Sequence, residues 1–582
     1  MAIRKTKIVC TLGPASDSEE VIRELMLGGM NVARMNFSHG THESHLKTLN
    51  IVKKVREELD LPVAALLDTK GPEIRLRTFK GGRITLEPGQ TFTLTSDEIE
   101  GTNERASITY KGLPSDVSQG TTILIDDGLI EMKVTDVTDT DIICRVVNGG
   151  EVSDHKGVNV PDCRLSMPFI SDQDYSDLVF GVENGYDFIA ASFTRTAQDI
   201  LDMRRVLAQH GDDSIRIIAK IENREGIDNI DDIIRVSDGI MVARGDMGVE
   251  IPFEEVPILQ KMIIKKCYQA GKIAITATQM LESMIENPRP TRAEVTDVAN
   301  AVYDNTSAVM LSGETAAGRY PVEAVKTMAR IAQMAEEAID YGKMLHDYQS
   351  APDTDITNAI SHACCTTAED LNASAIVTVT KSGFTARMLS KYRPVSPIIA
   401  CAMAQDVRRK LNLSWGVIPI LIGKEDSTDK LFDCAVDSAQ KAGLVKQGEV
   451  VVITAGVPLS VSGTTNILKV HVVGHVLIKG RGYGGKASGN LCVCSNESSL
   501  KRIYKQGDIV VISHTSNGIM EQLRTASAII TEEEGEDSHA AVVGSALSIP
   551  VITGAKNAVQ ILKQGTYVTV DADKGMVIAN NK

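Results

Sequence analysis

The chain has 582 residues, enough for about four domains of ordinary size. Its 76 Asp and Glu residues outnumber 61 Lys and Arg residues, and the resulting net charge of -15 disfavours nucleic acid and anionic membranes as partners. With 43% hydrophobic and 24% charged residues, the composition is that of a globular protein and excludes a chain that is disordered throughout.

The cysteines and the N-terminal segment do not resemble those of a secreted or membrane protein. Ten cysteines are too few for a disulfide scaffold in so long a chain, and their spacing contains no zinc-binding pair. The first apolar run stops at Gly13 and Pro14, which is too short for a signal peptide, and no run approaches the ~20 residues of a membrane span. We therefore expect a cytoplasmic protein.

Eight short apolar runs, rich in β-branched residues and ending in polar ones, recur through the first half of the chain. They read TKIVCTLG, MNVARMNFS, PVAALLDTK, DFIAASFTR, IRIIAKIEN, GIMVARGD, KIAITATQ and SAVMLSGET. Segments of helical period separate most of them, at 18–29, 174–184, 196–210 and 256–271. Strands that alternate with helices indicate a parallel sheet, and eight such units predict an α/β fold of the (β/α)₈ TIM-barrel type.

Three further domains are predicted from changes in this pattern. Residues 72–168 lose the helical period and show short alternating runs with turns, which predicts an all-β lid domain inserted into the barrel of 1–71 and 169–345. Residues 346–474 carry new apolar runs such as AIVTVT and EVVVITAG and predict an α/β domain. Residues 475–582 predict a compact, strand-rich tail domain.

Polar side chains two residues apart follow nearly every predicted barrel strand. Residues i and i+2 of a strand face the same side, and the C-terminal ends of barrel strands share one mouth. A solvated polar rim explains any single pair, but seven groups with both charge signs favour a shared catalytic site. The groups are Arg34, Asn36 and Ser38; Asp68 and Lys70; Ser192 and Thr194; Lys220 and Glu222; Arg244 and Asp246; Thr276 and Thr278; and Ser312 and Glu314.

The charged members of these groups narrow the chemistry. Glu222 and Asp246 follow adjacent strands and offer oxygen ligands to a hard divalent cation such as Mg²⁺, which takes its other ligands from substrate and water. Cationic side chains are expected around them, which suits a substrate rich in phosphate or carboxylate. These cations are Arg34, Lys70, Arg75, Lys220 and Arg244. His39, the histidine at these strand ends, is expected to orient its loop.

Six motifs in the same order resemble the pyruvate kinase family. They are RMNFSHG, DTKGPEIR, IIAKIENREGI, VARGDMGVE, TATQMLESM and MLSGETAAG, with an insertion after the third strand. The resemblance covers about residues 1–474, and the last hundred residues look like the extra C-terminal domain of some bacterial members. It implies phosphoryl transfer from phosphoenolpyruvate to ADP, giving pyruvate and ATP in the last step of glycolysis. It also implies a homotetramer.

Four catalytic positions follow from the resemblance. Lys220 matches the lysine that neutralises charge on the transferring phosphoryl group, and Arg34 matches the arginine on the substrate phosphate. Glu222 and Asp246 match the protein ligands of the substrate-bridging Mg²⁺ or Mn²⁺.

The resemblance also implies which residues bind the substrate carboxylate and lie close to the enolate. Gly245 and Asp246 match residues whose backbone N–H groups lie near the carboxylate, and Thr278 matches a carboxylate-binding threonine close to the enolate carbon. The proton donor to the enolate stays open among Thr278, Ser312 and Glu314.

The resemblance also implies a K⁺ site. Asn36, Ser38, Asp68 and Thr69 match its ligands and offer oxygens with only one formal charge, which suits a monovalent ion. Some members of the family do not need K⁺ and carry a positive side chain where GPEIR has its glutamate. Here that position is Glu73, so we expect activation by K⁺.

Arg75 and Lys156 match the family's ATP contacts. Lys156 lies in DHKGVNVP, where the chain returns from the predicted lid. His155 and the following PDCRLSMPFISDQD depart from the family pattern, so nucleotide selectivity does not follow from these residues.

A short loop after the predicted strand AIVTVT resembles the family's site for the phosphate of an allosteric activator. Backbone N–H groups at such a helix start favour phosphate, although a simple strand–helix turn is the alternative. Its residues are Thr380, Lys381, Ser382, Gly383 and Thr385. Bisphosphate-activated members bring a basic side chain from a loop that here spans 457–462 and carries none. A monophosphate such as AMP or a sugar monophosphate is therefore expected.

The tail resembles the mobile phosphohistidine domain of phosphoenolpyruvate-utilising enzymes. His539 matches the histidine that carries phosphate in a Thr-Ser-His-Ala-Ala stretch, but Asp537 replaces the threonine, and the downstream arginine is missing at Gly544 and Ser545. Because a carboxylate repels a phosphoryl group, we expect a structural or regulatory remnant.

Two other functions fit parts of the sequence. Metal-dependent aldolases and lyases also use two carboxylates and an arginine, but the insertion and DTKGPEIR favour a nucleotide-using enzyme. A non-catalytic phosphate sensor would need an impaired site, whereas every matched catalytic position is intact.

Overall fold

The computed structural model describes residues 3–347, 355–423, 425, 427–456 and 465–579. The chain forms two compact units. Unit 1 contains the described residues of Met1–His362, Thr380–Leu421 and Pro458–Thr465. Unit 2 contains those of Ala363–Val379, Ile422–Val457 and Asn466–Lys582.

Eight parallel strands of unit 1 close into a barrel, which confirms the predicted α/β barrel fold. Around the barrel the order is β1-β17-β16-β15-β14-β13-β3-β2. The strands are β1 (Lys7–Thr11), β2 (Val32–Asn36), β3 (Ala64–Asp68), β13 (Phe188–Ala191), β14 (Arg216–Ile221), β15 (Gly239–Ala243), β16 (Ile273–Ala277) and β17 (Ala308–Leu311). Asn36 pairs with Asp68 across β2 and β3, so the polar groups at these strand ends lie side by side.

The barrel strands are buried on both faces, which explains their nearly continuous apolar runs. Alternate side chains fill the barrel interior; among them are Val9, Leu66, Phe188, Ile218 and Met241. The other side chains of the same strands pack against the surrounding helices.

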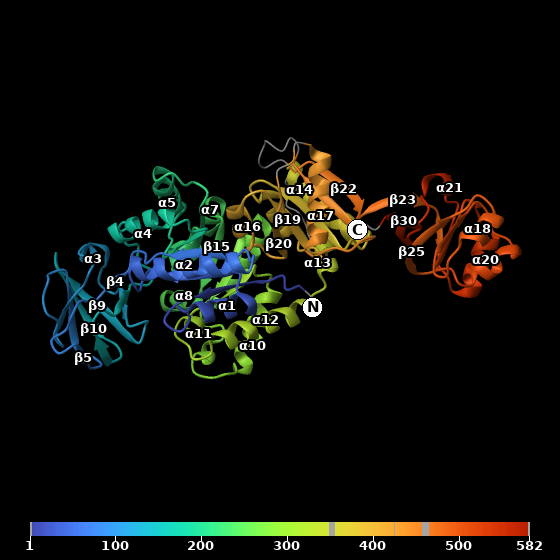
Figure 1. Cartoon of the computed structure of the whole chain (residues 1–582). Coiled ribbons are helices and arrows are strands. Elements are labelled where there is room, and N and C mark those ends of the chain that lie inside the picture. The colour runs from blue at the N-terminus through green and yellow to red at the C-terminus, as the bar shows by residue number, and fades with distance from the viewer. Residues whose placement is uncertain (1–2, 348–354, 424, 426, 457–464, 580–582) are drawn as a thin grey trace. The chain divides into compact units, whose positions relative to one another are not determined.

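Helices connect the barrel strands and cover the barrel, as the ribbon in Figure 1 shows for α1, α2 and α12. They are α1 (Glu19–Gly28), α2 (His42–Glu58), α4 (Asp172–Glu183), α5 (Ala197–Gln209), α6 (Arg224–Asp228), α7 (Ile230–Val236), α8 (Arg244–Glu250), α9 (Val256–Ala270), the 3₁₀ helix η1 (Glu282–Ile285), α10 (Arg292–Tyr303), α11 (Gly313–Ala316), α12 (Pro321–Glu337) and α13 (Tyr341–Asp347). Capping boxes at Thr41, Ser171, Thr196 and Thr291 fix where α2, α4, α5 and α10 begin. In the part of the chain that the structure describes, no helix combines the length and the apolar character needed to span a bilayer.

The insertion after β3 is a mostly antiparallel β domain around its own core, which includes Leu76, Phe92, Ile123 and Met132. Its sheets have the orders β4-β12-β8-β9-β10-β6-β7 and β11-β5. The elements are β4 (Ile74–Arg75), β5 (Arg83–Leu86), β6 (Thr91–Thr95), β7 (Arg105–Ser107), α3 (Leu113–Asp116), β8 (Thr122–Ile125), β9 (Ile130–Val137), β10 (Asp141–Val146), β11 (Gly150–Ser153) and β12 (Gly157–Asn159).

The α/β elements after the barrel are shared between the two units. Helix α14 (Ile356–Asp370) begins in unit 1 and ends in unit 2. In unit 1, the parallel strands β19 (Ile398–Ala402) and β20 (Val417–Leu421) alternate with α15 (Phe384–Lys391) and α16 (Gln405–Leu411). In unit 2, β18 (Ala375–Thr380, up to Val379) pairs in parallel with β21 (Val450–Ala455), which follows α17 (Thr428–Lys441) and pairs antiparallel with β22 (Ile467–Val472).

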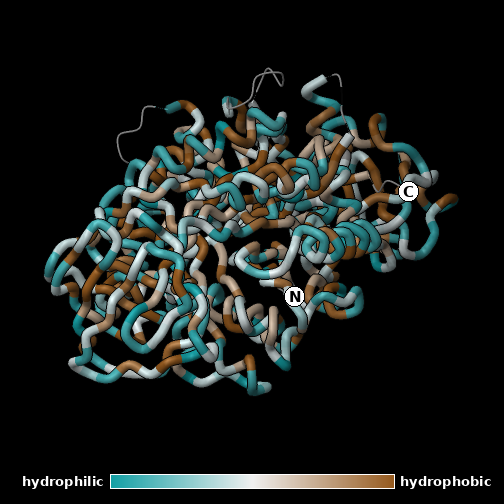
Figure 2. Tube along the Cα trace, turned by 90° about the vertical axis from the view of Figure 1, so that its left-hand side faces the viewer, coloured by the Kyte–Doolittle hydropathy of each residue, from teal (hydrophilic) through white to brown (hydrophobic). Residues whose placement is uncertain are grey.

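The rest of unit 2 is a tail built on a mixed eight-stranded sheet of order β23-β30-β29-β25-β26-β27-β28-β24. Its elements are β23 (His475–Lys479), β24 (Arg481–Tyr483), β25 (Lys486–Val493), α18 (Glu497–Ile503), β26 (Ile509–Ile512), η2 (Asn517–Ile519), α19 (Met520–Leu523), β27 (Ala528–Thr531), α20 (His539–Leu547), β28 (Val551–Thr553), α21 (Ala558–Ile561), β29 (Tyr567–Asp571) and β30 (Met576–Ala579). Hydrophobic and hydrophilic stretches alternate along the trace in Figure 2, as elements with one buried face require.

Candidate active site

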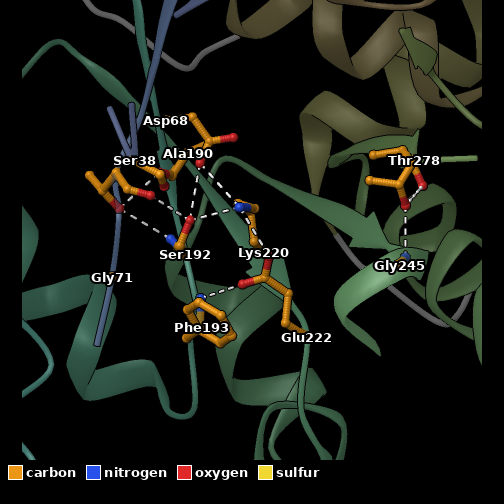
Figure 3. A network of polar contacts seen from close by, with 12 residues as sticks. Ser38, Asp68, Gly71, Ala190, Ser192, Phe193, Lys220, Glu222, Gly245 and Thr278 are labelled. Atoms are coloured by element: carbon orange, nitrogen blue, oxygen red, sulfur yellow. Dashed lines mark hydrogen bonds and ion pairs between the residues drawn. The ribbon is translucent and has the colours of Figure 1, made fainter. Parts of the chain in front are cut away.

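Lys220 lies at the centre of a buried polar network at the C-terminal ends of the barrel strands (Figure 3). Its ammonium is 2.7 Å from Ser192 Oγ, 3.1 Å from Asp68 Oδ1 and 3.0 Å from Glu222 Oε1. Burial by itself lowers the pKa of Lys220. The negative charges of Asp68 and Glu222 together have the larger effect and raise this pKa well above its usual value. The ammonium is therefore held charged in a site that excludes most water.

Arg34 and Asp68 form the second part of this network. Arg34 donates from Nε to Asp68 Oδ2 at 2.6 Å and from Nη1 to Thr11 Oγ1 at 2.7 Å. Asp68 is fully buried, which alone would raise its pKa, yet Arg34 and Lys220 hold the pKa below its ordinary value. The sequence predicted Arg34, Asp68 and Lys220 at one mouth, and the structure brings them into direct contact.

Glu222 is fully buried beside Lys220. Its Oε2 accepts the backbone N–H of Phe193 at 2.5 Å, and Phe193 adopts the left-handed conformation, with φ 54°, that directs this N–H. Burial, opposed by Lys220 and reinforced by Asp246, raises the pKa of Glu222 to about 8. Among the described residues, Oε1 of Glu222 forms an ion pair with Lys220 but no hydrogen bond.

These two carboxylates fit a divalent cation. Asp246 is exposed in the first turn of α8, close enough for its charge to act on Glu222, and β14 and β15 are neighbours in the barrel. Within the described ranges no group of three or more His, Cys, Asp and Glu side chains is arranged to hold a metal alone. An ion between Glu222 and Asp246 would therefore need further oxygens from substrate or water, which is the usual way that Mg²⁺ binds.

Gly245, in the first turn of α8, and Thr278, which directly follows β16, lie together (Figure 3). Thr278 Oγ1 accepts the Gly245 N–H at 2.8 Å and donates to Ala277 O at 2.6 Å. Thr278 has φ 66°, a left-handed conformation that strains a β-branched residue. The fold holds this hydroxyl and this N–H at one edge of the mouth in spite of that strain.

Asn36, Ser38, Asp68 and Thr69, predicted as monovalent-ion ligands, follow the paired strands β2 and β3. Asn36 Oδ1 accepts the Ser38 N–H at 3.2 Å, and Thr69 is buried with its N–H on Ala190 O at 3.0 Å. The four residues lie at the ends of these paired strands and offer neutral oxygens and a single carboxylate, while their role as ion ligands stays a prediction.

A cavity of about 340 Å³ opens beside this network, between the inserted domain and the barrel. Arg75 and Lys156 line it, together with Asp246. Arg75 donates to Glu73 Oε2 at 2.7 Å and to His155 O at 2.9 Å, and Lys156 pairs with Asp126 at 2.7 Å. The two cations predicted to contact a nucleotide therefore share one cavity with a predicted metal ligand.

Arg244 does not join the cations around the carboxylates, so that expectation was wrong. It pairs with Asp297 at 2.7 Å and donates to Thr278 O at 2.6 Å. Its Nε also donates to Ala277 O at 3.3 Å and its Nη2 to Gln279 O at 3.1 Å, and these bonds around the end of β16 support Thr278. Asp297 lies 53 residues further along the chain, on α10, so strand-end spacing could not reveal this pair.

The sequence reasoning also missed Thr11 and Asp174. Thr11 is the last residue of β1 and accepts from Arg34, so the rule that strand ends face the mouth could have found it. Asp174 is buried in the capping box of α4 and also accepts the Gly71 N–H at 3.0 Å, which fixes the turn after Thr69. No local sequence signal distinguishes it from an ordinary helix cap.

The predicted effector loop precedes α15, whose cap Gly383 has φ 78° and supplies no side-chain cap. Thr380 Oγ1 accepts the Gly383 N–H at 2.9 Å, and Thr385 bonds Thr465 at 2.8 Å. The helix therefore begins without a side-chain oxygen on its first N–H groups, as an anion site requires. The segment 457–462, on which the choice of a monophosphate depends, lies outside the described residues, and the phosphate loop stays a prediction.

In the tail, His539 begins α20, and both of its ring nitrogens have partners. Nδ1 is 2.9 Å from Thr515 Oγ1, and Nε2 is 3.1 Å from Asn517 Oδ1. A phosphoryl group on either nitrogen would have to displace one of these partners.

Comparison with known proteins agrees with this geometry. Family models described as "Pyruvate kinase, barrel domain", "Pyruvate kinase, alpha/beta domain" and "PEP-utilising enzyme, mobile domain" match residues 3–325, 358–471 and 504–575. Pyruvate kinases of Bacillus licheniformis and Geobacillus stearothermophilus are each 50% identical, over 99% of this chain and 99% and 98% of theirs.

A solved structure supports the same conclusion. The crystal structure of a pyruvate kinase from Cryptosporidium parvum is 42% identical and has a TM-score of 0.77, covering 81% of this chain and 96% of that one. Together with the family models and the full-length relatives, this shows that the chain is a phosphotransferase that belongs to the pyruvate kinase family.

Proposed function

We propose that the barrel mouth transfers the phosphoryl group of phosphoenolpyruvate to ADP, with Lys220 as the central electrostatic group. The observation that carries this assignment is the buried contact of Lys220 with Asp68, Ser192 and Glu222. A fixed ammonium in a site with little water stabilises charge that develops during phosphoryl transfer far better than a solvated one. Lys220 is therefore assigned to the phosphoryl group in flight.

Glu222 and Asp246 are the proposed ligands of Mg²⁺ or Mn²⁺. Their support is the buried Glu222 Oε1, which accepts no hydrogen bond among the described residues, and a second carboxylate in the helix that follows the neighbouring strand β15. When bound, the divalent ion would bridge substrate oxygens and reduce the negative charge of the phosphoryl group. Arg34 binds the same phosphate as a fork-shaped cation, and Asp68 fixes its orientation.

The backbone N–H groups of Gly245 and Asp246 and the Thr278 hydroxyl are proposed to bind the substrate carboxylate. Gly245 and Thr278 already contact each other at 2.8 Å, so both reach the same point. Of the three candidate proton donors, Glu314 accepts backbone N–H bonds from Leu281 and Ser312 through its two oxygens, at 3.0 and 2.7 Å. These bonds favour a role for Glu314 in holding the strand end, with Thr278 and Ser312 nearer the reaction.

Asn36, Ser38, Asp68 and Thr69 are proposed to bind K⁺, since their oxygens supply one formal charge to a site next to Lys220. ADP is proposed to bind in the cavity beside the inserted domain. Arg75 and Lys156 line that cavity and would contact the nucleotide phosphates.

The loop Thr380–Thr385 is proposed to bind the phosphate of an activator, such as AMP or a sugar monophosphate. Thr380, Lys381, Ser382, Gly383 and Thr385 surround the uncapped start of α15, which favours an anion.

The remaining proposals concern the tail, the assembly and the location. Asp537 lies two residues before His539, and both ring nitrogens are hydrogen-bonded, which favours a remnant that does not carry phosphate. Radiolabelled phosphoenolpyruvate should leave His539 unlabelled, and a labelled tail would contradict this. We also propose a homotetramer in the cytoplasm, as in the relatives' family.

A coupled assay tests the assignment directly. Pyruvate should form from phosphoenolpyruvate only when ADP and Mg²⁺ are both present, and K⁺ should activate the reaction. Release of pyruvate without ADP would favour a lyase, and no turnover under any of these conditions would favour the phosphate sensor.

A further inference from the structure

Ser192 is part of the buried polar network around Lys220, but the proposed reaction gives it no role. It follows β13, the strand between β3 and β14, and is 2% exposed. Its Oγ lies 2.7 Å from Lys220 Nζ, 3.0 Å from Asp68 Oδ1 and 2.6 Å from Thr69 O (Figure 3). One hydroxyl therefore touches the ammonium and two residues of the proposed ion site.

The chemistry of these groups fixes the direction of each bond. An ammonium only donates, so the Ser192 oxygen accepts from Lys220. A hydroxyl has a single proton, which Ser192 therefore gives either to Thr69 O or to Asp68 Oδ1. The shorter contact is the one to Thr69 O, a backbone carbonyl that keeps a second lone pair for another partner.

We infer that Ser192 is a positioning residue that fixes the Lys220 ammonium and links it to the oxygens that bind K⁺. The inference rests on the proposed function, since it takes Lys220 as the transfer lysine and Asp68 and Thr69 as ion ligands. Lys220 donates to Asp68 Oδ1 and Ser192 Oγ and forms an ion pair with Glu222 Oε1, so Ser192 supplies one of the two hydrogen-bond acceptors that fix the ammonium. Without the Ser192 hydroxyl, the Lys220 ammonium loses one of its hydrogen-bond acceptors, and the long side chain of Lys220 regains rotamer freedom.

The same hydroxyl ties the ion site together. Its single proton goes to Thr69 O or to Asp68 Oδ1, at 2.6 and 3.0 Å, and the Ser192 N–H donates to Thr69 Oγ1 at 3.2 Å. A cation drawn to these oxygens therefore acts on groups that already orient Lys220. Loss of the hydroxyl should weaken both the rate and the response to K⁺, which a purely structural serine would not do.

The test compares Ser192→Ala and the nearly isosteric Ser192→Cys with a control, Ser237→Ala. Ser237 is 1% exposed, and its Oγ has no hydrogen-bond partner among the described residues, so the control removes an equally buried hydroxyl outside the site. We expect kcat to fall about tenfold to a hundredfold in both Ser192 variants, with KM for phosphoenolpyruvate changed less than threefold. The K⁺ concentration for half activation should rise severalfold, and Ser237→Ala should match the wild type.

A second readout does not depend on activity. The Tm of the unliganded wild type should rise when KCl replaces tetramethylammonium chloride, and this rise should shrink in the Ser192 variants. If Ser192→Ala does not fold, Ser192→Cys decides the question, because a thiol of similar volume is a poor hydrogen-bond partner. Either variant with wild-type kcat and wild-type K⁺ response would overturn the inference.

Failure of the proposed function has a different signature. If neither the rate nor the Tm of the wild-type protein responds to K⁺, the proposed ion site is wrong, and so is the proposed link through Ser192. If the wild type responds to K⁺ and the Ser192 variants show the same rate and the same response, the ion site stands and only the role of Ser192 is refuted.

Discussion

The Lys220 ammonium lies 3.1 Å from the Asp68 carboxylate although β13 separates their strands, β14 and β3. Two side chains can meet in this way because barrel strands direct their last residues toward a common axis. Asp68 also binds Arg34 at 2.6 Å, so one buried carboxylate fixes the positions of two cations. The fold itself therefore holds these two positive charges in fixed positions.

The first prediction concerns Lys220→Met. We expect kcat to fall at least a hundredfold, because a fixed charge on the transferring phosphoryl group is lost. The fold should persist, since Arg34 still pairs with Asp68 and Glu222 can take up a proton with its pKa raised to about 8. The coupled assay and circular dichroism measure both effects, with Lys80→Met, which changes an exposed lysine of the inserted domain, as the control. Turnover within tenfold of wild type would remove Lys220 from this role.

The second prediction concerns K⁺. Tetramethylammonium in place of K⁺ should lower kcat at least tenfold, and Glu73→Lys should make the rate nearly independent of K⁺. A lysine there supplies a fixed charge next to Arg75, whose Nε now donates to Glu73 at 2.7 Å. Glu87→Lys, which changes an exposed glutamate of the same domain, is the matched control and should keep the K⁺ requirement. Equal rates of the wild type in both salts would contradict the ion site.

The barrel and most of its mouth could be predicted because they depend on local rules. Each buried parallel strand requires a continuous apolar run, and the side chains just after it must face the mouth. Asp68, Lys220 and Glu222 therefore followed from spacing alone. The resemblance to a family then added their roles.

What could not be predicted depends on backbone direction and on distant pairs. The N–H of Phe193 reaches Glu222 only because Phe193 is left-handed, which no side-chain pattern in SFTR indicates. Arg244 matched the other cations in type and spacing, yet its ion pair is with Asp297, a carboxylate on α10. Spacing along a strand indicates on which face a residue lies. The partner of a long side chain depends on residues that are distant in the sequence, and spacing does not reveal those.

The third prediction tests the effector loop. Lys381→Glu should raise the concentration of AMP or sugar monophosphate needed for half activation at least tenfold, because it places a negative charge beside the phosphate. Lys430→Glu makes the same charge change at an exposed position on α17 and should leave activation unaltered. Titrations of initial rate measure both variants. Stimulation of the wild type by fructose 1,6-bisphosphate alone would show that the loop serves a different ligand.

The fourth prediction separates strain from chemistry at Thr278. Thr278→Ala and Thr278→Gly should both lose most of kcat, because each removes the hydroxyl that meets the Gly245 N–H. Thr278→Gly should be the more stable of the two by about 1 kcal/mol, since glycine adopts a φ of this sign without strain. Urea unfolding of the two variants, followed side by side, gives this difference. Equal urea midpoints would show that the φ of 66° stores no strain.

The last prediction is a pH dependence of stability that comes from Lys7. Lys7 is buried at the start of β1, donates to Val417 O at 2.6 Å, and lies near Arg4 and Glu336. Burial, reinforced by Arg4 and opposed by Glu336, lowers the pKa of Lys7 to about 7. In the unfolded chain the same lysine titrates near ~10.4. Between these values the unfolded state binds more protons, so the contribution of Lys7 to the free energy of unfolding rises with pH and is lost as pH falls toward 7.

The Lys7→Met substitution removes the pH-dependent contribution of Lys7 to the free energy of unfolding. The difference in unfolding free energy between wild type and Lys7→Met should therefore shift in favour of the wild type by up to about 1 kcal/mol for each pH unit from pH 7 to pH 9. Urea midpoints measured at half-unit steps give the slope, and Lys80→Met, at an exposed site, should run parallel to the wild type. Parallel curves for Lys7→Met and wild type would mean that Lys7 stays charged when folded, because only a lysine that gives up its proton on folding can make their difference depend on pH.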